Sequence, residues 1–323
     1  MKLARVLYGD GHYRVCAIAA DARSGTDYVV DLASAASASG QQPADGQGPF
    51  RSIRALLEVG DLAIDAARKA LAHAEERGIQ DSQWGMPLQG ARLGAPIARP
   101  GKVLALAGNY RAHRAEGGVS SPEPTQALPE VFCKPVTSVI GPDEAIKIPG
   151  PPVAGTDYEG ELGVVIGKHC FHVSEQDSYN YIGGYLCLND VSGRKLDPGF
   201  ERPAELAARA KFFDWLIGKW PDTFCPIGPY LVTAEEVKDP MNLTLVTRVN
   251  GEERQRTNTG EMIHSIARTI AYCSQFMTLE PGDIIATGTP AGVGSARGVF
   301  LKDGDVVEVE ITGLGTLRNP VRG

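Results

Sequence analysis

Short apolar runs separated by turns rich in glycine and proline recur along most of the chain. Runs of this length, bounded by turn residues, predict strands rather than long helices. Beyond residue 100 the runs are Val103–Ala107, Leu162–Ile166, Ile182–Asn189, Tyr230–Val232, Leu243–Val249, Asp283–Thr287 and Val306–Ile311. A chain that consists mainly of strands with isolated helices favours a large mixed sheet or barrel over regular βαβ repeats.

The first 95 residues follow a different pattern. Leu3–Leu7 and Tyr28–Leu32 read as short strands, and Ile53–Arg77 has apolar residues at helical spacing. Ala33–Gly48 is rich in Ala, Ser, Gln and Gly, which predicts a mobile loop. This region carries no recognisable chemistry.

A junction and one later helix complete the predicted organisation. Gln89–Lys102 is rich in Pro and Gly, so we expect a boundary there, between a small domain at 1–95 and a larger one at 96–323. In the larger domain Thr259–Phe276 is predicted to be helical, because its apolar residues fall on one face.

Composition narrows the class of protein. The hydrophobic and charged fractions, 43% and 22%, are those of an ordinary globular protein. The formal charge of −7 argues against nucleic acid and anionic membranes as partners. No run of about 18 apolar residues occurs and the N-terminus is charged, so we expect a cytoplasmic protein. The six cysteines are scattered singly, which predicts buried free thiols.

Two glutamates stand at the start of one predicted strand. Glu159 and Glu161 are two positions apart, so in a strand their side chains share a face. Buried together they would repel unless a cation lay between them, and ligands that are all oxygen suit Mg²⁺, Mn²⁺ or Ca²⁺. Taken alone, such a pair is more often a solvated strand end.

Asp190 follows the apolar run Tyr181–Leu188, where an acidic residue at a strand end can point into a site. By itself it reads as a turn or cap residue. Together with Glu159 and Glu161 it would form a facial carboxylate set with open positions for substrate and water.

A second candidate site follows the strand Val103–Ala107. On a helical turn His113 and Glu116 are neighbours at i and i+3. A carboxylate beside an imidazole fixes its tautomer and raises its basicity, as proton abstraction from water requires. A surface His–Glu pair is the plain alternative.

The glycine-rich segment Thr287–Gly294 resembles a nucleotide loop only superficially. Arg297 stands where the dinucleotide fingerprint needs a small residue, and no Gly-Lys-Ser/Thr occurs. A tight loop whose amides or Thr289 hydroxyl meet an anion is the better interpretation.

In this order, over about residues 100–320, these motifs resemble the fumarylacetoacetate hydrolase family. They are Gly108-Asn109-Tyr110 with His113 and Glu116, Phe132-Cys133-Lys134-Pro135, Asp157–Leu162, Gly184-Tyr185 with Asn189–Ser192, Gly218-Lys219 through Asp222–Pro229, and Thr287–Gly294. The resemblance implies an α+β, mainly β protein, with a mixed β-roll as its C-terminal domain and a small α/β N-terminal domain. It also implies a homodimer.

The resemblance assigns roles to individual residues. A divalent cation, usually Mg²⁺, would be held by Glu159, Glu161 and Asp190, with Mn²⁺ or Ca²⁺ as alternatives. The catalytic residues would be His113, Glu116 and Lys219, and the substrate-binding residues Arg194, Thr289, Lys134 and Tyr110. Gly193 and Lys195 depart from the family pattern of Ala and Asp, and the segment Lys195–Ile217 is longer than in short members. The substrate pocket is therefore expected to be unusual.

The implied reaction is hydrolytic cleavage of a carbon–carbon bond in an acylpyruvate-like or 2,4-diketo acid. Hydroxide formed by His113 and Glu116 would attack the C4 carbonyl, and breakage of C3–C4 would leave an enolate whose charge a metal stabilises. Lys219 would hold that charge or protonate C3. An oxaloacetate-type decarboxylase or a 2-hydroxy-dienoate isomerase would share the enolate. A catalytically silent ligand-binding relative would lack the dyad or a carboxylate, and neither is missing here.

Overall fold

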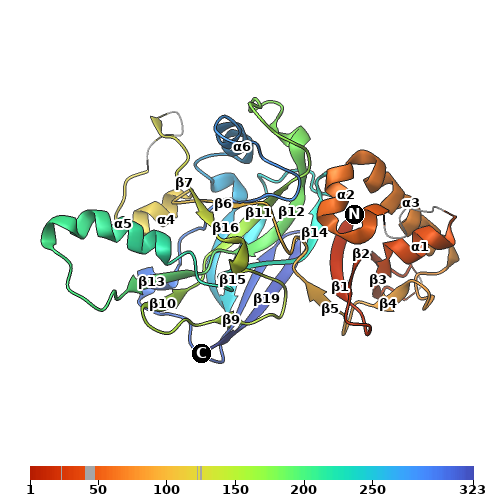
Figure 1. The fold of residues 1–323 in the computed structure, drawn as a ribbon, viewed down its shortest axis with the longest axis horizontal. Coiled ribbons are helices and arrows are strands. Elements are labelled where there is room, and N and C mark those ends of the chain that lie inside the picture. Colours follow the sequence, from red (N-terminus) through yellow and green to blue (C-terminus); the bar gives the residue numbers. More distant parts are fainter. Residues whose placement is uncertain (23, 41–47, 122, 124–125) are drawn as a thin grey trace.

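Strands form three sheets in the computed structural model, which describes residues 1–22, 24–40, 48–121, 123 and 126–323. The largest sheet runs through the whole molecule (Figure 1). Its path is β4 (Gly85–Pro87), β3 (Asp27–Asp31), β2 (Tyr13–Ala20), β1 (Lys2–Leu7), β14 (Cys225–Thr233), β12 (Ile182–Asn189), β11 (Gly160–Ile166), β17 (Ile284–Ala286), β6 (Val103–Leu106) and β7 (Val131–Lys134). Off this path, β5 (Arg92–Gly94) pairs with β1, and β8 (Val139–Ile140) with β14.

Two smaller sheets complete the strand framework. The five-stranded sheet runs β16 (Glu252–Asn258), β15 (Thr244–Val249), β18 (Val306–Ile311), β19 (Gly315–Arg322) and β9 (Ile146–Lys147). A ribbon pairs β10 (Val153–Asp157) with β13 (Ser192–Leu196). The pairs β17–β6, β14–β8 and β19–β9 are parallel and the other pairs antiparallel. This confirms the prediction of a mainly β fold with mixed sheets.

Helices lie between and outside the sheets. The α-helices are α1 (Leu32–Ala38), α2 (Ile53–Val59), α3 (Asp61–Arg77), α4 (Arg111–Glu116), α5 (Ala207–Ile217), α6 (Ile266–Ser274) and α7 (Gly294–Arg297). Short 3₁₀ turns are η1 (Gly48–Arg51), η3 (Val136–Ser138), η4 (Ser178–Tyr181), η5 (Ala204–Leu206), η6 (Ala234–Glu236) and η7 (Thr259–Glu261). The first three helices cover the N-terminal strands, and α5 extends away from the sheets (Figure 1). No described helix is long and apolar enough to cross a bilayer.

The central strands bury both faces, so they carry two cores. In β12, Leu186 and Leu188 belong to the core under α1, α2 and α3, whereas Tyr185 and Cys187 face the core shared with the five-stranded sheet. Side chains two apart share a face of a strand, so near-continuous apolar runs supply both cores. Polar residues are found at the ends of these strands, where they can form a functional site.

Two predictions in the N-terminal region are corrected by the structure. Residues 33–38 are not a loop but part of α1, because Asp31 caps this helix through the Ala33 and Ser34 amides. Residues 41–47 of the predicted loop lie outside the described residues. Ile53–Arg77 is helical as predicted but breaks at Gly60, whose φ of 77° ends α2 before α3 begins.

Later in the chain, all seven predicted strands form. The predicted helix Thr259–Phe276 is shorter, because the side chain of Ser265 caps α6 and the preceding residues form η7 and a turn. The long segment Lys195–Ile217 contains α5, the helix that extends away from the sheets. All six cysteines are free as predicted, and Cys133 alone among them is exposed.

The sheet passes without a break from the N-terminal strands to the rest of the molecule. Leu3 of β1 pairs with Leu231 of β14, and β14 in turn pairs with β12. The division near residue 95 stays a prediction about independent folding.

Candidate active site

Three carboxylates meet where β11 begins and β12 ends. Gly160 pairs with Asn189 in the antiparallel ladder, so Glu159 and Glu161 lie beside Asp190. The backbone of Asp190 donates to the Glu159 carbonyl over 2.8 Å, and the Asn189 side chain accepts from the Glu159 amide over 2.9 Å. One oxygen from each carboxylate falls within 4.8 Å of the others, and all three side chains are buried. The predicted set is therefore assembled in the fold.

Three cations surround the carboxylates. Lys219, just after α5, donates to both Glu159 and Asp190 over 2.7 Å. Arg194 of β13 donates through Nε to Asp157 and through Nη2 to Glu159, over 2.8 and 2.5 Å. Lys134 of β7 lies 2.5 Å from Asp190 Oδ1, with its hydrogen bonds going to the Val191 and Lys219 carbonyls. With Asp157 included, four carboxylates thus face three cations.

The two glutamates have opposite pKa shifts. Burial alone would raise the pKa of Glu159, but Lys219 and then Arg194 hold it well below its usual range. Burial raises the pKa of Glu161 well above its usual range, and Asp190 and Glu159 raise it further. Burial opposes the charge of Lys219, yet Asp190 and Glu159 raise its pKa. Glu161 is therefore the carboxylate short of positive charge.

These residues fit a hard divalent cation. The donor set is all carboxylate oxygen, which suits Mg²⁺, Mn²⁺ or Ca²⁺. The raised pKa of Glu161 reflects a buried negative charge without its own cation. A divalent ion would supply the missing charge.

The second predicted pair forms on α4. His113 Nδ1 lies 2.7 Å from Glu116 Oε1, and both side chains are about one-fifth exposed, at 21% and 20%. His113 lies near enough to Glu159 for its charge to lower the pKa of that carboxyl. The imidazole therefore stands between solvent and the carboxylate set.

Backbone amides of the glycine-rich loop meet anions, as the sequence predicted, and the anions are the protein's own carboxylates. Gly288 donates to Glu161 over 2.8 Å and Gly292 to Glu116 over 2.9 Å. Gly294 and Ser295 donate to Asp157 over 2.7 and 2.9 Å. One loop thus fixes a candidate metal ligand, the dyad and the carboxylate that holds Arg194.

Two residues assigned to substrate binding have different surroundings in the fold. The Thr289 hydroxyl donates to the Gly160 carbonyl and accepts from Gln255, over 3.0 and 2.8 Å. The Tyr110 hydroxyl is buried without a partner in the described chain, and burial together with Glu161 raises its pKa. Tyr110 therefore has a free hydroxyl near the carboxylates, whereas Thr289 is engaged.

Two aromatic rings flank Lys219. Its ammonium lies 5.2 Å from the Phe132 ring and 5.7 Å from Trp215 of α5, and the two rings pack edge to face. The long segment before Lys219 thus brings an aromatic residue to the site.

Sequence reasoning missed Asp157 and Gln255. Gln255 of β16 accepts from the Gly160 amide and donates to Thr289 and the Pro290 carbonyl, so it ties the loop to β11. Its signal was an uncharged amide between two arginines, Arg254 and Arg256, in a largely charged strand. Asp157 stood within a recognised motif, but nothing local indicated its bond to Arg194.

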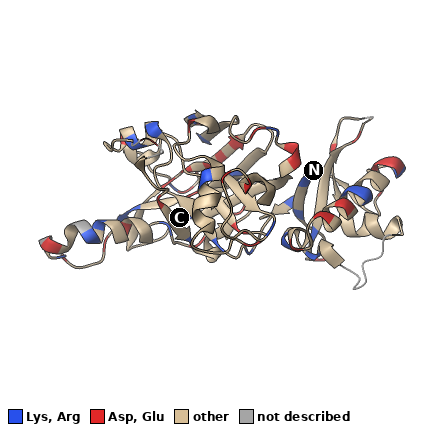
Figure 2. Cartoon of the chain, turned by 90° about the horizontal axis from the view of Figure 1, so that it is seen from above, with Lys and Arg blue, Asp and Glu red and all other residues tan. Residues whose placement is uncertain are grey.

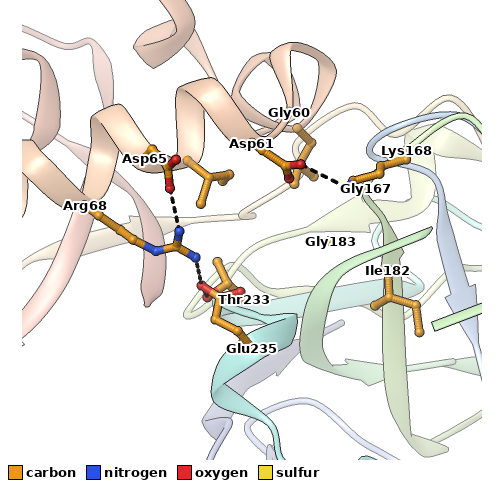
Figure 3. A pocket seen from close by; sticks show the side chains of 12 residues that line it. Gly60, Asp61, Asp65, Arg68, Gly167, Lys168, Ile182, Gly183, Thr233 and Glu235 are labelled. Atoms are coloured by element: carbon orange, nitrogen blue, oxygen red, sulfur yellow. Dashed lines mark hydrogen bonds and ion pairs between the residues drawn. The ribbon is translucent and has the colours of Figure 1, made fainter. Parts of the chain in front are cut away.

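A separate cavity of about 290 Å³ lies between α3, the end of β11 and the start of β12 (Figure 3). Arg68 bridges Asp65 and Glu235, each over 2.7 Å, and Lys168 lies 3.2 Å from Asp61. Because these charges are satisfied within the protein, the carboxylate set remains the candidate active site.

Known proteins resemble this chain over most of its length. The family model of the fumarylacetoacetate (FAA) hydrolase C-terminal domain matches residues 102–322. The 2,4-didehydro-3-deoxy-L-rhamnonate hydrolase of Sphingomonas sp. (strain SKA58) is 41% identical over 280 residues, 86% of this chain and 90% of that protein. Oxaloacetate tautomerase fahd2 of Xenopus laevis, a mitochondrial protein, is 39% identical over 271 residues, 83% of this chain and 78% of that one.

A solved structure extends the likeness to the whole chain. Maleylpyruvate hydrolase from Sphingobium sp. SYK-6, in complex with manganese(II) and pyruvate, matches with a TM-score of 0.72 and 29% identity. The match covers 100% of this chain and 99% of that one.

Proposed function

Since the chain belongs to the fumarylacetoacetate hydrolase family, we propose that it is a metal-dependent hydrolase that cleaves a carbon–carbon bond in an acylpyruvate-like or 2,4-diketo acid. The observation that carries the proposal is the His113–Glu116 pair beside the Glu159, Glu161 and Asp190 set. A base for water and a cation site for an enolate are the two parts that such a hydrolysis needs.

Each residue has a definite task in this scheme. Glu116 fixes His113 by accepting from Nδ1–H, so that Nε2 can take a proton from water as its oxygen attacks C4. The water hydroxyl ends on C4 as a carboxylic acid, the C3–C4 electron pair becomes an enolate, and a proton completes C3. Lys219 is the cation placed to stabilise the enolate or to donate that proton. Glu159, Glu161 and Asp190 would hold a divalent ion, which would supply positive charge for the enolate.

The relatives support the reaction class. The Sphingomonas protein is named for hydrolysis of a 2,4-didehydro-3-deoxy acid, which is oxidised at carbons 2 and 4. Oxaloacetate tautomerisation, the activity named for the Xenopus protein, is the second candidate, because it interconverts an oxo acid and its enol without attacking water. Decarboxylation of oxaloacetate and isomerisation of a dienoate also need no attacking water.

A substrate panel tests the proposal. Diketo acids absorb in the ultraviolet and lose that absorbance on cleavage, so a panel of acylpyruvates with oxaloacetate included identifies the reaction. We expect hydrolysis to exceed every reaction of oxaloacetate. Turnover of oxaloacetate with intact diketo acids would overturn the hydrolase assignment and favour the second candidate.

His113→Ala separates the dyad from the metal. We expect this variant to bind metal stoichiometrically while hydrolysis falls about 10²–10⁴-fold, and His113→Ala/Glu116→Gln to be little worse. Any oxaloacetate reaction should fall less, because it needs no hydroxide. Loss of metal with the histidine would make His113 a ligand instead.

We propose Mg²⁺ as the ion and a homodimer as the assembly. Activity lost to a chelator should return with Mg²⁺ or Mn²⁺, and light scattering should give twice the chain mass of 34.4 kDa. Full activity in chelated, metal-free protein would exclude the metal role, and a monomer mass would exclude the dimer.

A further inference from the structure

Helix α4, which carries the His–Glu pair, is anchored at its N-terminal end, where Tyr110 is buried and bridges to Met262. It spans only Arg111–Glu116 and buries none of its residues. Among the described residues, its side-chain hydrogen bonds otherwise stay within the local segment, such as Arg114 to Ser120 and Glu130. At the C-terminal end of the helix, the bond from Gly292 to Glu116 reaches a distant part of the chain, across 176 positions.

With that contact, both oxygens of the Glu116 carboxylate have a hydrogen-bond partner. One oxygen faces His113 Nδ1 over 2.7 Å, and the other accepts from the Gly292 amide over 2.9 Å. A carboxylate held at both oxygens cannot rotate away from the imidazole without breaking a hydrogen bond. The direction of the His113 ring therefore depends on where the loop places Gly292.

Gly292 is itself held on two sides. Its carbonyl accepts from the buried Tyr158 hydroxyl over 3.1 Å. Its φ is +106°, and a Cβ there would lie 2.2 Å from the Arg254 carbonyl oxygen, so only glycine fits. Tyr158 immediately precedes Glu159, so the same chain segment supplies a candidate metal ligand and the anchor of the loop.

We propose that Gly292, anchored by the Tyr158 hydroxyl, is the positioning residue of the His113–Glu116 pair. It fixes the C-terminal end of helix α4, and with it the imidazole, relative to the carboxylate set. The inference rests on the proposed role of this pair in activating water. Gly292 and Tyr158 themselves touch no reacting atom in this scheme.

Gly292→Ala is the direct test, with Gly298→Ala as its control. Gly298 also has a positive φ, 68°, but a Cβ there meets nothing within 4 Å, so it adds backbone strain without moving the loop. In Gly292→Ala we expect kcat to fall about 10²-fold, the scale of a misplacement of about 1 Å, with KM and bound metal unchanged. Gly298→Ala should stay within about twofold of the wild type.

Two further readouts separate positioning from a general structural role. The Nδ1–H proton of His113, assigned by ¹⁵N-histidine labelling of the magnesium-loaded resting protein, should give a hydrogen-bonded resonance that Gly292→Ala loses and Gly298→Ala keeps. In a Glu116→Gln background, Gly292→Ala should lower kcat by less than about threefold further, because its effect passes through the Glu116 carboxylate. Should Gly292→Ala fail to fold, Tyr158→Phe removes only the anchoring hydroxyl, and it should lower kcat about 2- to 10-fold and weaken the same resonance.

An unchanged resonance with unchanged kcat, or an undiminished loss in the Glu116→Gln background, would overturn the proposal. The resonance is read without substrate. If it responds as expected while no diketo acid is cleaved, the positioning holds and the proposed function fails. If a diketo acid is hydrolysed but the resonance does not respond, the proposed function holds and the positioning proposal fails.

Discussion

Glu159 shares its carboxylate between two cations from different elements, Lys219 after α5 and Arg194 on β13. Glu161, two residues on, receives a backbone amide instead. Neighbouring acids of one motif therefore respond differently to charge, and this difference leads to two predictions.

Lys219→Met should destabilise the metal-free protein by about 3–5 kcal/mol, because it leaves buried carboxylates without their shared cation. A divalent ion would replace part of the lost charge, so the rise in Tm on adding Mg²⁺ should be larger than in the wild type. Paired thermal scans with and without Mg²⁺ measure this. Lys168→Met, which removes an exposed ion pair, should change stability by less than about 1 kcal/mol. Equal Mg²⁺ increments in the wild type and Lys219→Met would contradict the prediction.

The raised pKa of Glu161 predicts proton release on metal binding. Above its ordinary pKa of 4.5, folding without metal keeps a proton on Glu161 that the unfolded chain has lost, so stability falls as pH rises toward the folded pKa. A bound cation needs the ionised form, so Mg²⁺ affinity should increase with pH across this window. Calorimetry in buffers of different ionisation enthalpy counts the released protons. Glu161→Gln should abolish that release, and release that persists in it would assign the proton elsewhere.

The opposite shift of Glu159 acts at lower pH. Its lowered pKa contributes stability that is present above 4.5 and is lost as pH falls toward the folded pKa. The two glutamates therefore affect separate pH windows, above and below 4.5.

Pairs of site residues that are close in the sequence could be predicted from their spacing. The strand period placed Glu159 beside Glu161, and the helical period placed His113 beside Glu116. The bonds of Gln255 to Gly160 and of Gly292 to Glu116 were missed because they span 95 and 176 positions. The residues around Gln255 and Gly292 do not indicate which distant partner each would meet.

Among the elements, β11 and β15 approach each other closely at Gly160. A Cβ on Gly160 would lie 2.0 Å from Thr247 Oγ1, so Gly160→Ala should cost about 1–3 kcal/mol of unfolding free energy. Thr247 Oγ1 is buried without a hydrogen-bond partner in the described chain, so Thr247→Ala alone should be nearly neutral. The double variant should recover most of the loss, as denaturant titrations of the four proteins would measure. Additive losses would place the strain elsewhere.

Helices and strands were predictable from the sequence where their buried faces produce a regular pattern of apolar residues. The central strands have two buried faces and therefore apolar runs, which identified β12 to the residue. The edge strand β16 is half exposed and largely charged, so its sequence carries little strand signal. The ends of the helices depended on single residues, Gly60 and Ser265. The spacing of apolar residues gives no information on the effect of such single residues.

Over the whole molecule, acidic and basic residues are interspersed rather than gathered into one basic face (Figure 2). This agrees with the net charge of −7.

The continuous sheet predicts one thermal unfolding transition. Because β1 pairs with β14, the first 95 residues cannot separate without breaking the central ladder. Of the three tryptophans, Trp84 alone lies in that region, so the Trp215→Phe/Trp220→Phe variant reports it selectively. Its fluorescence transition should coincide with loss of far-ultraviolet circular dichroism. An earlier Trp84 transition would instead support independent domains divided near residue 95.

The pairing of β1 with β14 also bears on how the chain is made. Met1 bonds to Thr233, 232 positions later, so the ribosome must add those residues before the edge of β1 that faces β14 can pair with it, while the other edge pairs with β2 nearby. At about 5–20 residues per second this takes about 10 to 50 s. During synthesis the apolar side chains and open edge of β1 are available to wrong partners. The nascent chain should therefore depend on chaperones that hold N-terminal segments, more than a protein in which both edges of the first strand pair locally.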